Sequence, residues 1–202
     1  ATPMSIMVAS GRGAAAGVLF KNAEAIEVLR KVDTLVVDKT GTLTVGKPRL
    51  VSVYVQSPRS EEEILTMAAG LEMGSEHPLA AAIVEGANQR GIKPSRAENF
   101  KSVTGKGVIG VVGGEEVALG NRALLEELGV DVGSLADKAE ELRREGQTAM
   151  FVVIGGRPAG LIGVADPIKD TTAEAIKQLH DEGIAIVMLT GDSRTTAKAV
   201  AD

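Results

Sequence analysis

The stretch Thr34-Leu35-Val36-Val37-Asp38-Lys39-Thr40-Gly41-Thr42-Leu43-Thr44 decides how the rest of the chain is interpreted. The apolar, β-branched run before Asp38 predicts a strand that ends at this carboxylate. The hydroxyls and the glycine that follow direct the carboxylate off the carboxyl edge of a sheet, where α/β folds bind their ligands, and Gly41 allows a sharp turn there. This arrangement predicts a nucleophile presented for phosphoryl transfer. The alternative is an aspartate that only caps the next turn.

The composition excludes several classes of protein. The 202 residues are 44% hydrophobic, which is enough for one or two domains with a sizeable core. Lys and Arg number 22 against 27 Asp and Glu, the net charge is −5 and aromatic residues make up 2%, so we expect no nucleic-acid partner. The chain has no cysteine, which excludes disulfides and thiolate metal sites within it. We find neither a signal peptide nor the ~20 apolar residues of a membrane span, so we expect a soluble segment in the cytosol.

From about Arg49 to Val164 the pattern indicates an antiparallel sheet with helices packed on it. Gly113-Gly114 and Gly155-Gly156 each separate two apolar runs, which is typical of hairpins. The predicted elements are strands over 108–112, 117–119, 151–154 and 159–164, a helix from the capping box at Ser60 to Leu71, a helix from Pro78 to Gly91, and short helices capped by Asn121 and Ser134.

The remaining residues return to an alternation of helices and strands. A helix over 172–182 and the strand Ile184–Leu189 precede Thr190-Gly191-Asp192, so a second strand delivers a hydroxyl and an acid to its carboxyl end. We also expect a helix over 22–31, and either a helix or a frayed terminus over 3–17. Because the chain stops inside an apparently uncapped helix, we expect it to be a segment of a longer protein.

The heptad Asp38 to Thr44 resembles the phosphorylation motif of P-type ATPases, ion pumps that pass through an aspartyl-phosphate intermediate. The resemblance implies that Asp38 attacks the γ-phosphate of ATP, with Lys39 in the same catalytic motif. It also implies a Mg²⁺ ion held by the Asp38 carboxylate and the Thr40 backbone carbonyl. Related haloacid-dehalogenase-like phosphatases carry a second aspartate, the general acid and base, where this chain has Thr40. Without that base the acyl phosphate should hydrolyse slowly, which favours a pump.

Two further motifs resemble parts of the same phosphorylation domain. Thr190, Gly191 and Asp192 match the family's Thr-Gly-Asp, in which the threonine helps to hold the phosphoryl group. Asp166-Pro167 resembles the hinge at which an inserted domain returns to the phosphorylation domain, although a simple turn is the alternative.

The segment between these motifs resembles the nucleotide-binding domain of heavy-metal-transporting P-type ATPases, in which a His-Pro pair is a hallmark. The resemblance implies that Glu72 and His77 read the adenine, and a neutral imidazole offers a flat face with one donor and one acceptor. The residues implied to border the same pocket are Gly105, Gly107, Val108, Gly120 and Asn121.

The amino end, residues 1–7, resembles the stretch that follows the membrane Cys-Pro-Cys motif of copper and silver pumps. That ligand motif is absent, so copper is the metal we expect and zinc is the rival. We expect no tight site for the transported metal in this chain.

The sequence therefore predicts an α/β fold. A partial haloacid-dehalogenase-like, Rossmann-like phosphorylation domain spans 1–48 and 165–202, with a membrane-proximal segment 1–19, and an inserted α+β nucleotide-binding domain on an antiparallel sheet spans 49–164. The expected function is the ATP-binding and phosphorylation region of a cation-transporting ATPase, in the cytoplasmic part of an integral membrane protein. Its expected cofactors are ATP and Mg²⁺, and its expected partners are the membrane helices and actuator domain of the same pump.

The family's Gly-Asp-Gly-x-Asn-Asp loop, which supplies a further Mg²⁺-binding aspartate, does not occur in the sequence. We therefore expect the chain alone to bind nucleotide with little turnover. The alternatives are a soluble haloacid-dehalogenase-like phosphatase and a non-catalytic nucleotide-binding module.

Overall fold

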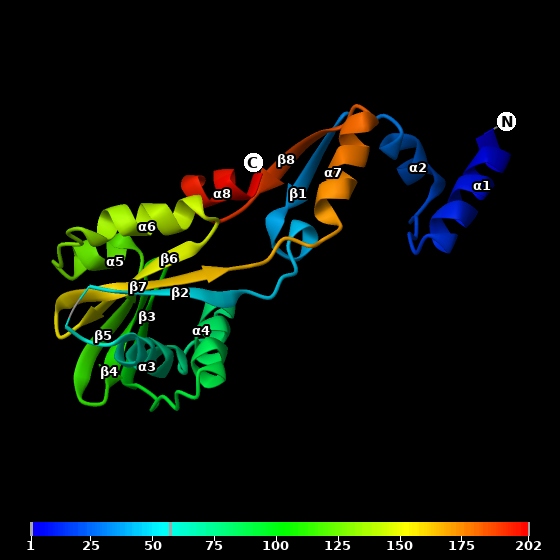
Figure 1. The fold of residues 1–202 in the computed structure, drawn as a ribbon. Helices are drawn as coiled ribbons and strands as arrows, with labels where there is room; N and C mark the ends of the chain where they lie inside the picture. Colours follow the sequence, from blue (N-terminus) through cyan, green and yellow to red (C-terminus); the bar gives the residue numbers. More distant parts are fainter. Residues whose placement is uncertain (1, 57, 202) are drawn as a thin grey trace. The chain divides into compact units, whose positions relative to one another are not determined.

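The computed structural model of the chain describes residues 2–56 and 58–201 (Figure 1). The outer ends of the predicted phosphorylation domain, Ala1 and Asp202, lie outside the described residues. The helices are α1 (Thr2–Ala15), α2 (Ala23–Leu29), α3 (Glu61–Glu72), α4 (Pro78–Gln89), α5 (Arg122–Glu127), α6 (Leu135–Arg144), α7 (Thr172–Asp181) and α8 (Arg194–Ala201). The strands are β1 (Thr34–Asp38), β2 (Arg49–Val55), β3 (Glu98–Val103), β4 (Gly107–Val112), β5 (Glu115–Gly120), β6 (Thr148–Ile154), β7 (Arg157–Ala165) and β8 (Ala185–Leu189).

The chain divides into two compact units. One contains the residues up to Val37 together with Thr171–Met188, and the other contains Asp38–Asp170 together with the residues from Leu189 onward. The domain boundaries expected at 48/49 and 164/165 stay predictions.

In the first unit, β1 and β8 form a two-stranded sheet. The amide of Ala185 donates to the carbonyl of Asp33 at 2.8 Å at the start of this pairing. Exposure alternates along β1, and Val36 keeps 55% of its surface exposed. β1 ends at Asp38, as the apolar run predicted, so this carboxylate lies at the carboxyl end of the strand.

The second unit is built on a six-stranded sheet in the order β2-β7-β6-β5-β4-β3, with every neighbouring pair antiparallel. Both hairpins expected at Gly113-Gly114 and Gly155-Gly156 are present, as β4 with β5 and β6 with β7. The predicted antiparallel sheet with packed helices is therefore confirmed.

Helices cover both faces of this sheet (Figure 1). Along β6, Val152 and Ile154 face α3 and α4, whereas Phe151 and Val153 face α5 and α6. Successive side chains of a strand point to opposite faces, so a strand that is covered on both sides is apolar throughout. This explains the continuous apolar runs in the sequence.

The helix ends follow the capping predictions in two of three cases. The capping box is present, because Ser60 accepts the amide of Glu63 and the Glu63 carboxylate accepts the amide of Ser60. Asn121 caps α5 by accepting the amide of Leu124 at 3.2 Å. The expected cap at Ser134 is wrong, because its side chain makes no capping hydrogen bond and instead accepts the Gln56 amide at 3.0 Å.

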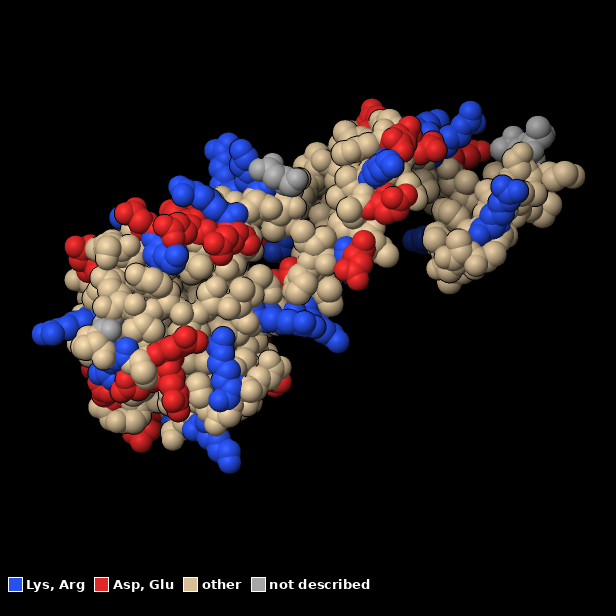
Figure 2. Space-filling view, viewed as in Figure 1, with Lys and Arg blue, Asp and Glu red and all other residues tan. Residues whose placement is uncertain are grey.

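Figure 2 shows acidic and basic side chains interspersed over the visible face, with no large surface of one sign. Among the described residues, no helix is both long enough and apolar enough to cross a membrane.

Candidate functional site

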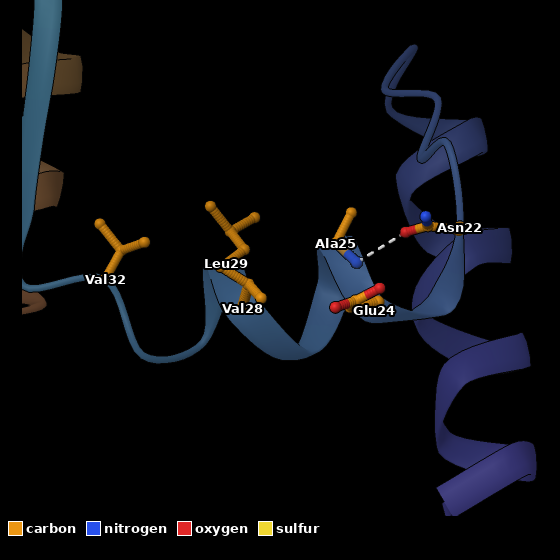
Figure 3. A pocket seen from close by; sticks show the side chains of 6 residues that line it. All are labelled: Asn22, Glu24, Ala25, Val28, Leu29 and Val32. Atoms are coloured by element: carbon orange, nitrogen blue, oxygen red, sulfur yellow. Dashed lines mark hydrogen bonds between the residues drawn. The ribbon is translucent and has the colours of Figure 1, made fainter.

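Two hollows in the surface contain none of the residues expected to act. One, of about 370 Å³, lies along α2 and is lined by Asn22, Glu24 and four apolar side chains (Figure 3). The Asn22 side chain there caps α2, because its Oδ1 accepts the amide of Ala25 at 2.8 Å. The other, of about 470 Å³, is mostly apolar and lies on the sheet around Ile109, Val117 and Val153. Neither hollow gathers a nucleophile with an acid or a base. The expected reactive residues are instead joined by polar contacts.

Asp38 is the last residue of β1 and its side chain is exposed. No hydrogen bond or ion pair engages its carboxylate among residues 2–56 and 58–201. Gly41 then turns the chain with φ at +75°. A left-handed backbone of this kind costs glycine little and other residues more, so the glycine is required by the turn. The result is a free carboxylate at the start of a tight turn.

The turn is closed from inside by Thr44, whose side chain is fully buried. Its hydroxyl accepts the amide of Gly41 at 3.2 Å and lies 2.5 Å from a carboxylate oxygen of Asp166 and 3.1 Å from the carbonyl of Lys39. A hydroxyl has one proton, so the short, charge-assisted contact with Asp166 is the one to which it donates.

Asp166 also binds the backbone beyond the turn. Its two carboxylate oxygens accept the amides of Gly46 and Lys47 at 3.1 and 3.0 Å. Three residues later, the Lys169 ammonium donates to the carbonyl of Gly41 at 2.7 Å. The segment predicted as a hinge therefore also holds the loop that follows Asp38.

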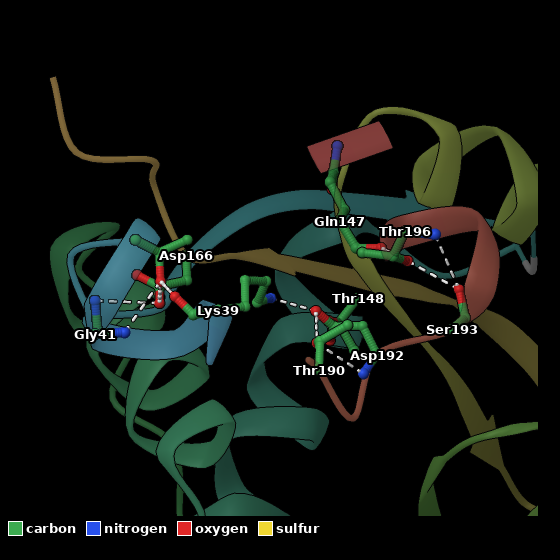
Figure 4. A network of polar contacts seen from close by, with 11 residues as sticks. Lys39, Gly41, Gln147, Thr148, Asp166, Thr190, Asp192, Ser193 and Thr196 are labelled. Atoms are coloured by element: carbon green, nitrogen blue, oxygen red, sulfur yellow. Dashed lines mark hydrogen bonds and ion pairs between the residues drawn. The ribbon is translucent and has the colours of Figure 1, made fainter. Parts of the chain in front are cut away.

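Lys39 is buried, with 8% of its surface exposed, and forms an ion pair with Asp192 (Figure 4). The same Asp192 oxygen accepts the hydroxyl of Thr190 at 3.1 Å, and the other oxygen accepts the hydroxyl of Thr148 at 3.3 Å. The structure thus brings together Lys39, Thr190 and Asp192, which the sequence had placed on two separate strands. Gly191 lies between them, is exposed and makes no close approach.

The residues expected to read adenine lie at neighbouring helix ends. Glu72 ends α3 with 6% of its surface exposed, and one of its carboxylate oxygens has no hydrogen-bond partner among the described residues. Burial raises the pKa of Glu72 above its usual value, and a hydrogen bond from Ser75 opposes this to a smaller extent. His77 is exposed and caps α4, with Nδ1 accepting the amide of Leu79 at 3.2 Å. An accepting Nδ1 places the proton of a neutral ring on Nε2, where it is free to donate.

The four remaining polar or glycine candidates converge on one end of the β4–β5 pair. Asn121 donates to the carbonyl of Gly105 at 2.8 Å, and Gly107 pairs with Gly120. A Cβ added to Gly107 would lie 2.2 Å from the carbonyl oxygen of Leu119, so only glycine fits there. Gly107 and Gly120 therefore have a packing role whether or not a ligand binds, whereas a Cβ at Gly105 would meet open space.

Val108 lies in the core between the sheet and helices α3 and α4, with 7% of its surface exposed. α3 packs on β4 and β5, so Glu72 sits at the end of the helix that covers the strands carrying the glycines. Among the described residues, no hydrogen bond joins Glu72 or His77 to the group around Gly105.

Sequence reasoning did not assign roles to Thr44, Thr148 or Lys169. Thr44 is the last residue of the heptad and Lys169 lies three residues after Asp166, so closeness to these motifs was the available signal. Thr148 has no local signal, because it is simply the first residue of an apolar strand. Among residues 2–56 and 58–201, no group of three or more His, Cys, Asp or Glu side chains is placed to hold a metal ion.

Comparison with known proteins identifies relatives over the whole chain. A family model described as haloacid dehalogenase-like hydrolase matches residues 32–202. The chain is 56% identical over 201 residues to a copper-transporting P-type ATPase of Rhizobium leguminosarum bv. viciae and 49% identical to a silver exporting P-type ATPase of Salmonella typhimurium. All of this chain is covered in both matches, but only 24% of each relative, so it spans about a quarter of their length.

Solved structures agree with this. The crystal structure of a zinc-transporting PIB-type ATPase in the E2.Pi state matches 99% of this chain and 32% of its own, with a TM-score of 0.76 and 36% identity. The catalytic CPx-ATPase domain CopB-B matches 95% of this chain and 65% of its own, with a TM-score of 0.65 and 26% identity. The resemblance to heavy-metal-transporting P-type ATPases and the predicted fold class are confirmed.

Proposed function

Because the chain belongs to the haloacid dehalogenase-like hydrolase family, we propose that it is the ATP-binding and phosphorylation region of a heavy-metal-transporting P-type ATPase, with copper as the transported metal. One observation carries the proposal. Asp38 is an exposed carboxylate without a partner among the described residues, at the end of β1 and beside the buried cation Lys39, in a chain similar over its whole length to copper and silver pumps.

In the proposed reaction, a carboxylate oxygen of Asp38 attacks the γ-phosphorus of ATP. The bond from this phosphorus to the β,γ-bridging oxygen breaks, ADP leaves with that electron pair, and Asp38 carries the phosphoryl group as an acyl phosphate. Water later hydrolyses the acyl phosphate. Thr40 stands where related phosphatases have a second acid, so the intermediate is long-lived enough to be coupled to transport.

Lys39 and Thr190 supply the polar surroundings of the transferred group. The ion pair with Asp192 holds the Lys39 ammonium in a buried position, where it favours a polyanion next to Asp38. Thr190 and Asp192 bond to each other, because the Asp192 amide donates to the Thr190 hydroxyl at 3.1 Å. We assign Lys39, Thr190 and Asp192 to the phosphoryl site, with Gly191 as the turn between the last two.

The donor chemistry at Asp38 fits Mg²⁺, which prefers carboxylate and carbonyl oxygens and keeps substrate phosphates and water as its other ligands. We assign the Asp38 carboxylate and the Thr40 carbonyl as ligands from this chain. A bound Mg²⁺ neutralises charge on the phosphoryl oxygens.

For the nucleotide, we propose that residues 49–164 form the binding domain. Glu72 and His77 are assigned to the adenine, and the assigned backbone and pocket residues are Gly105, Gly107, Val108, Gly120 and Asn121. The Nε2–H of the exposed His77 is available for a hydrogen bond to a base, and the unpartnered oxygen of Glu72 lies buried at the adjoining helix end. Asp166 and Pro167 are assigned to the hinge between this domain and the phosphorylation domain. The membrane helices and actuator domain belong to the longer protein.

Calorimetric titration of the chain with ATP tests the nucleotide assignment. His77→Ala should weaken binding by ~1–2 kcal/mol, the scale of one desolvated polar contact. His180→Ala is the matched control, because His180 is exposed in the last turn of α7 and has no assigned role. Equal affinities of the parent and His77→Ala would remove His77 from the site.

Metal-stimulated ATP hydrolysis by the full-length protein tests the choice of copper. We expect stimulation by Cu(I) and none by Zn²⁺, because transport and phosphorylation are coupled in a pump. Stimulation by Zn²⁺ alone would assign the chain to a zinc pump instead.

A further inference from the structure

We propose that Thr148 is a positioning residue for phosphoryl transfer: its hydroxyl fixes the Asp192 carboxylate against Lys39 and so attaches the start of β6 to the loop that follows Asp38. The positioning itself is read from the hydrogen bonds of Figure 4, whereas its effect on catalysis rests on the proposed function.

The first argument is that each oxygen of Asp192 has a different partner. One oxygen binds the Lys39 ammonium and the Thr190 hydroxyl, and the other accepts the Thr148 hydroxyl at 3.3 Å. The last torsion of an aspartate is broad, so contacts to one oxygen alone leave the carboxylate plane free to rotate. The Thr148 hydroxyl supplies the second point that fixes this plane and, through it, the direction of the Lys39 ammonium.

The second argument is that the chain after Asp192 is attached at the same place. Thr196, with 1% of its surface exposed, donates its hydroxyl to the carbonyl of Gln147 at 3.1 Å. Since that proton is used, the hydroxyl of Ser193 is the donor in its 3.0 Å contact with Thr196. The segment 192–196 is thus bound at two separate points. Asp192 binds Thr148 at the start of β6, and Thr196 binds Gln147 just before it.

A third contact secures the same helix. Thr195 in α8 donates to a carboxylate oxygen of Glu140 in α6 at 3.1 Å. With α8 held by α6 and by the strand, the turn that carries Asp192 has little freedom to follow a displaced carboxylate. Loss of the Thr148 hydroxyl therefore leaves the path of the backbone in place but removes one of the contacts that limit its local opening.

β6 is a suitable anchor because it lies inside the sheet. It is paired on one side with β7 and on the other with β5, which ends at Gly120 beside Asn121. The anchor for Lys39 therefore belongs to the same sheet as Gly107, Val108 and Gly120, which are assigned to the nucleotide. Thr148 pairs with Val164, two residues before Asp166, so this anchor lies at the end of the sheet next to the assigned hinge, where it holds the Lys39 ammonium in a defined direction.

The test uses the full-length protein with three substitutions. Thr148→Val removes the hydroxyl and preserves the shape, and Thr148→Ser restores the hydroxyl. Thr66→Val is the matched control, because the Thr66 hydroxyl only donates to the Glu62 carbonyl within its own helix at 2.6 Å. Three quantities are measured: the rate of phosphoenzyme formation from ATP, the affinity for ATP, and amide hydrogen exchange over residues 190–196.

We expect Thr148→Val to slow phosphoenzyme formation about tenfold, the effect of a small misplacement of a catalytic group, with ATP affinity unchanged. Exchange over residues 190–196 should become faster in this variant only. Thr148→Ser and Thr66→Val should behave as the parent. A wild-type rate and wild-type exchange in Thr148→Val would overturn the proposal, as would a loss of rate matched by an equal loss of ATP affinity or not restored by serine.

If the parent protein forms no phosphoenzyme, this result contradicts the proposed function but not the contact between Thr148 and Asp192. In that case hydrogen exchange alone decides. Faster exchange over residues 190–196 in Thr148→Val supports the positioning role of the hydroxyl, and unchanged exchange overturns it.

Discussion

Asp38 and Lys39 are adjacent in the sequence and have opposite surroundings. The carboxylate is exposed and has no partner among the described residues, whereas the ammonium is buried in an ion pair with Asp192. A reacting group has to be accessible, and a group that stabilises charge has to be held in place. The division between these two residues is therefore what phosphoryl transfer to Asp38 requires.

Glu72 should destabilise the fold at neutral pH, because a buried carboxylate with one unpartnered oxygen is costly when charged. Its pKa in the folded state is raised, so the folded state binds the proton more tightly than the unfolded state. This loss of folding stability is absent below the unfolded-state pKa of Glu72, about 4.3. It grows as the pH rises through the folded-state pKa and is complete above it.

Glu72→Gln should consequently raise the free energy of unfolding at pH 7 by about 1 kcal/mol and remove this pH dependence. Urea denaturation between pH 4 and pH 8 measures it. The exposed Glu85→Gln in α4 is the control and should change little. A lower stability of Glu72→Gln at pH 7 would mean that the charged carboxylate is satisfied in the folded protein.

Asp166 should hold the loop after Asp38 through its charge. Asp166→Asn keeps an acceptor but loses the charge-assisted bond from Thr44 and one of the bonds to the Gly46 and Lys47 amides. We expect a loss of about 1–2 kcal/mol in the free energy of unfolding and faster amide exchange at Gly46. The exposed Asp170→Asn is the control. Unchanged exchange at Gly46 in Asp166→Asn would show that the loop does not depend on this carboxylate.

At the scale of elements, local chemistry predicted most of the fold. The glycine pairs located both hairpins, and the capping box located α3, because these signals act within a few residues. β3 was not predicted, since polar residues interrupt its apolar pattern and a bulge shifts its register between Glu98 and Lys101. Ser134 was misjudged because its backbone is helical, with φ at −67° and ψ at −13°, whereas a residue that caps through its side chain is extended.

The candidate site shows the same limit. The sequence pattern placed Asp38, Thr190 and Asp192 at the carboxyl ends of two strands. Contacts that join residues more than 40 positions apart, such as Thr148 with Asp192 and Thr44 with Asp166, have no local signal in a single sequence. The motifs therefore supplied the candidate reactive groups, and the structure was needed to find the residues that contact them.

The end of the β4–β5 pair should tolerate no side chain at Gly107. Its φ is +152°, and a Cβ would lie 2.2 Å from a backbone carbonyl oxygen, so strand pairing has to be disrupted. Gly107→Ala should lower the free energy of unfolding by about 2–4 kcal/mol. Gly114→Ala is the matched control, with φ at +82° and open space, and should cost about 1–2 kcal/mol. Equal losses of unfolding free energy in the two variants would show that the contact between a Cβ at position 107 and the Leu119 carbonyl is not what requires glycine there.

For the whole molecule, the net charge of −5 opposes the approach of a polyanion such as ATP. Attraction to the proposed nucleotide must therefore be local. We expect Lys169 to contribute to it, because its ammonium donates to the Gly41 carbonyl in the loop that follows Asp38. Lys39 lies in the same loop, and Asp192 pairs with its charge. Short-range cations on rigid elements lose less to salt screening than a diffuse basic surface does.

The central claim is that Asp38 forms an acyl phosphate, and labelling the full-length protein with ATP carrying a labelled γ-phosphate tests it most directly. We predict an acid-stable, hydroxylamine-sensitive label on Asp38 that Asp38→Asn abolishes and the neighbouring Asp33→Asn retains. A label that persists in Asp38→Asn, or a folded, ATP-binding parent that acquires none, would contradict the account.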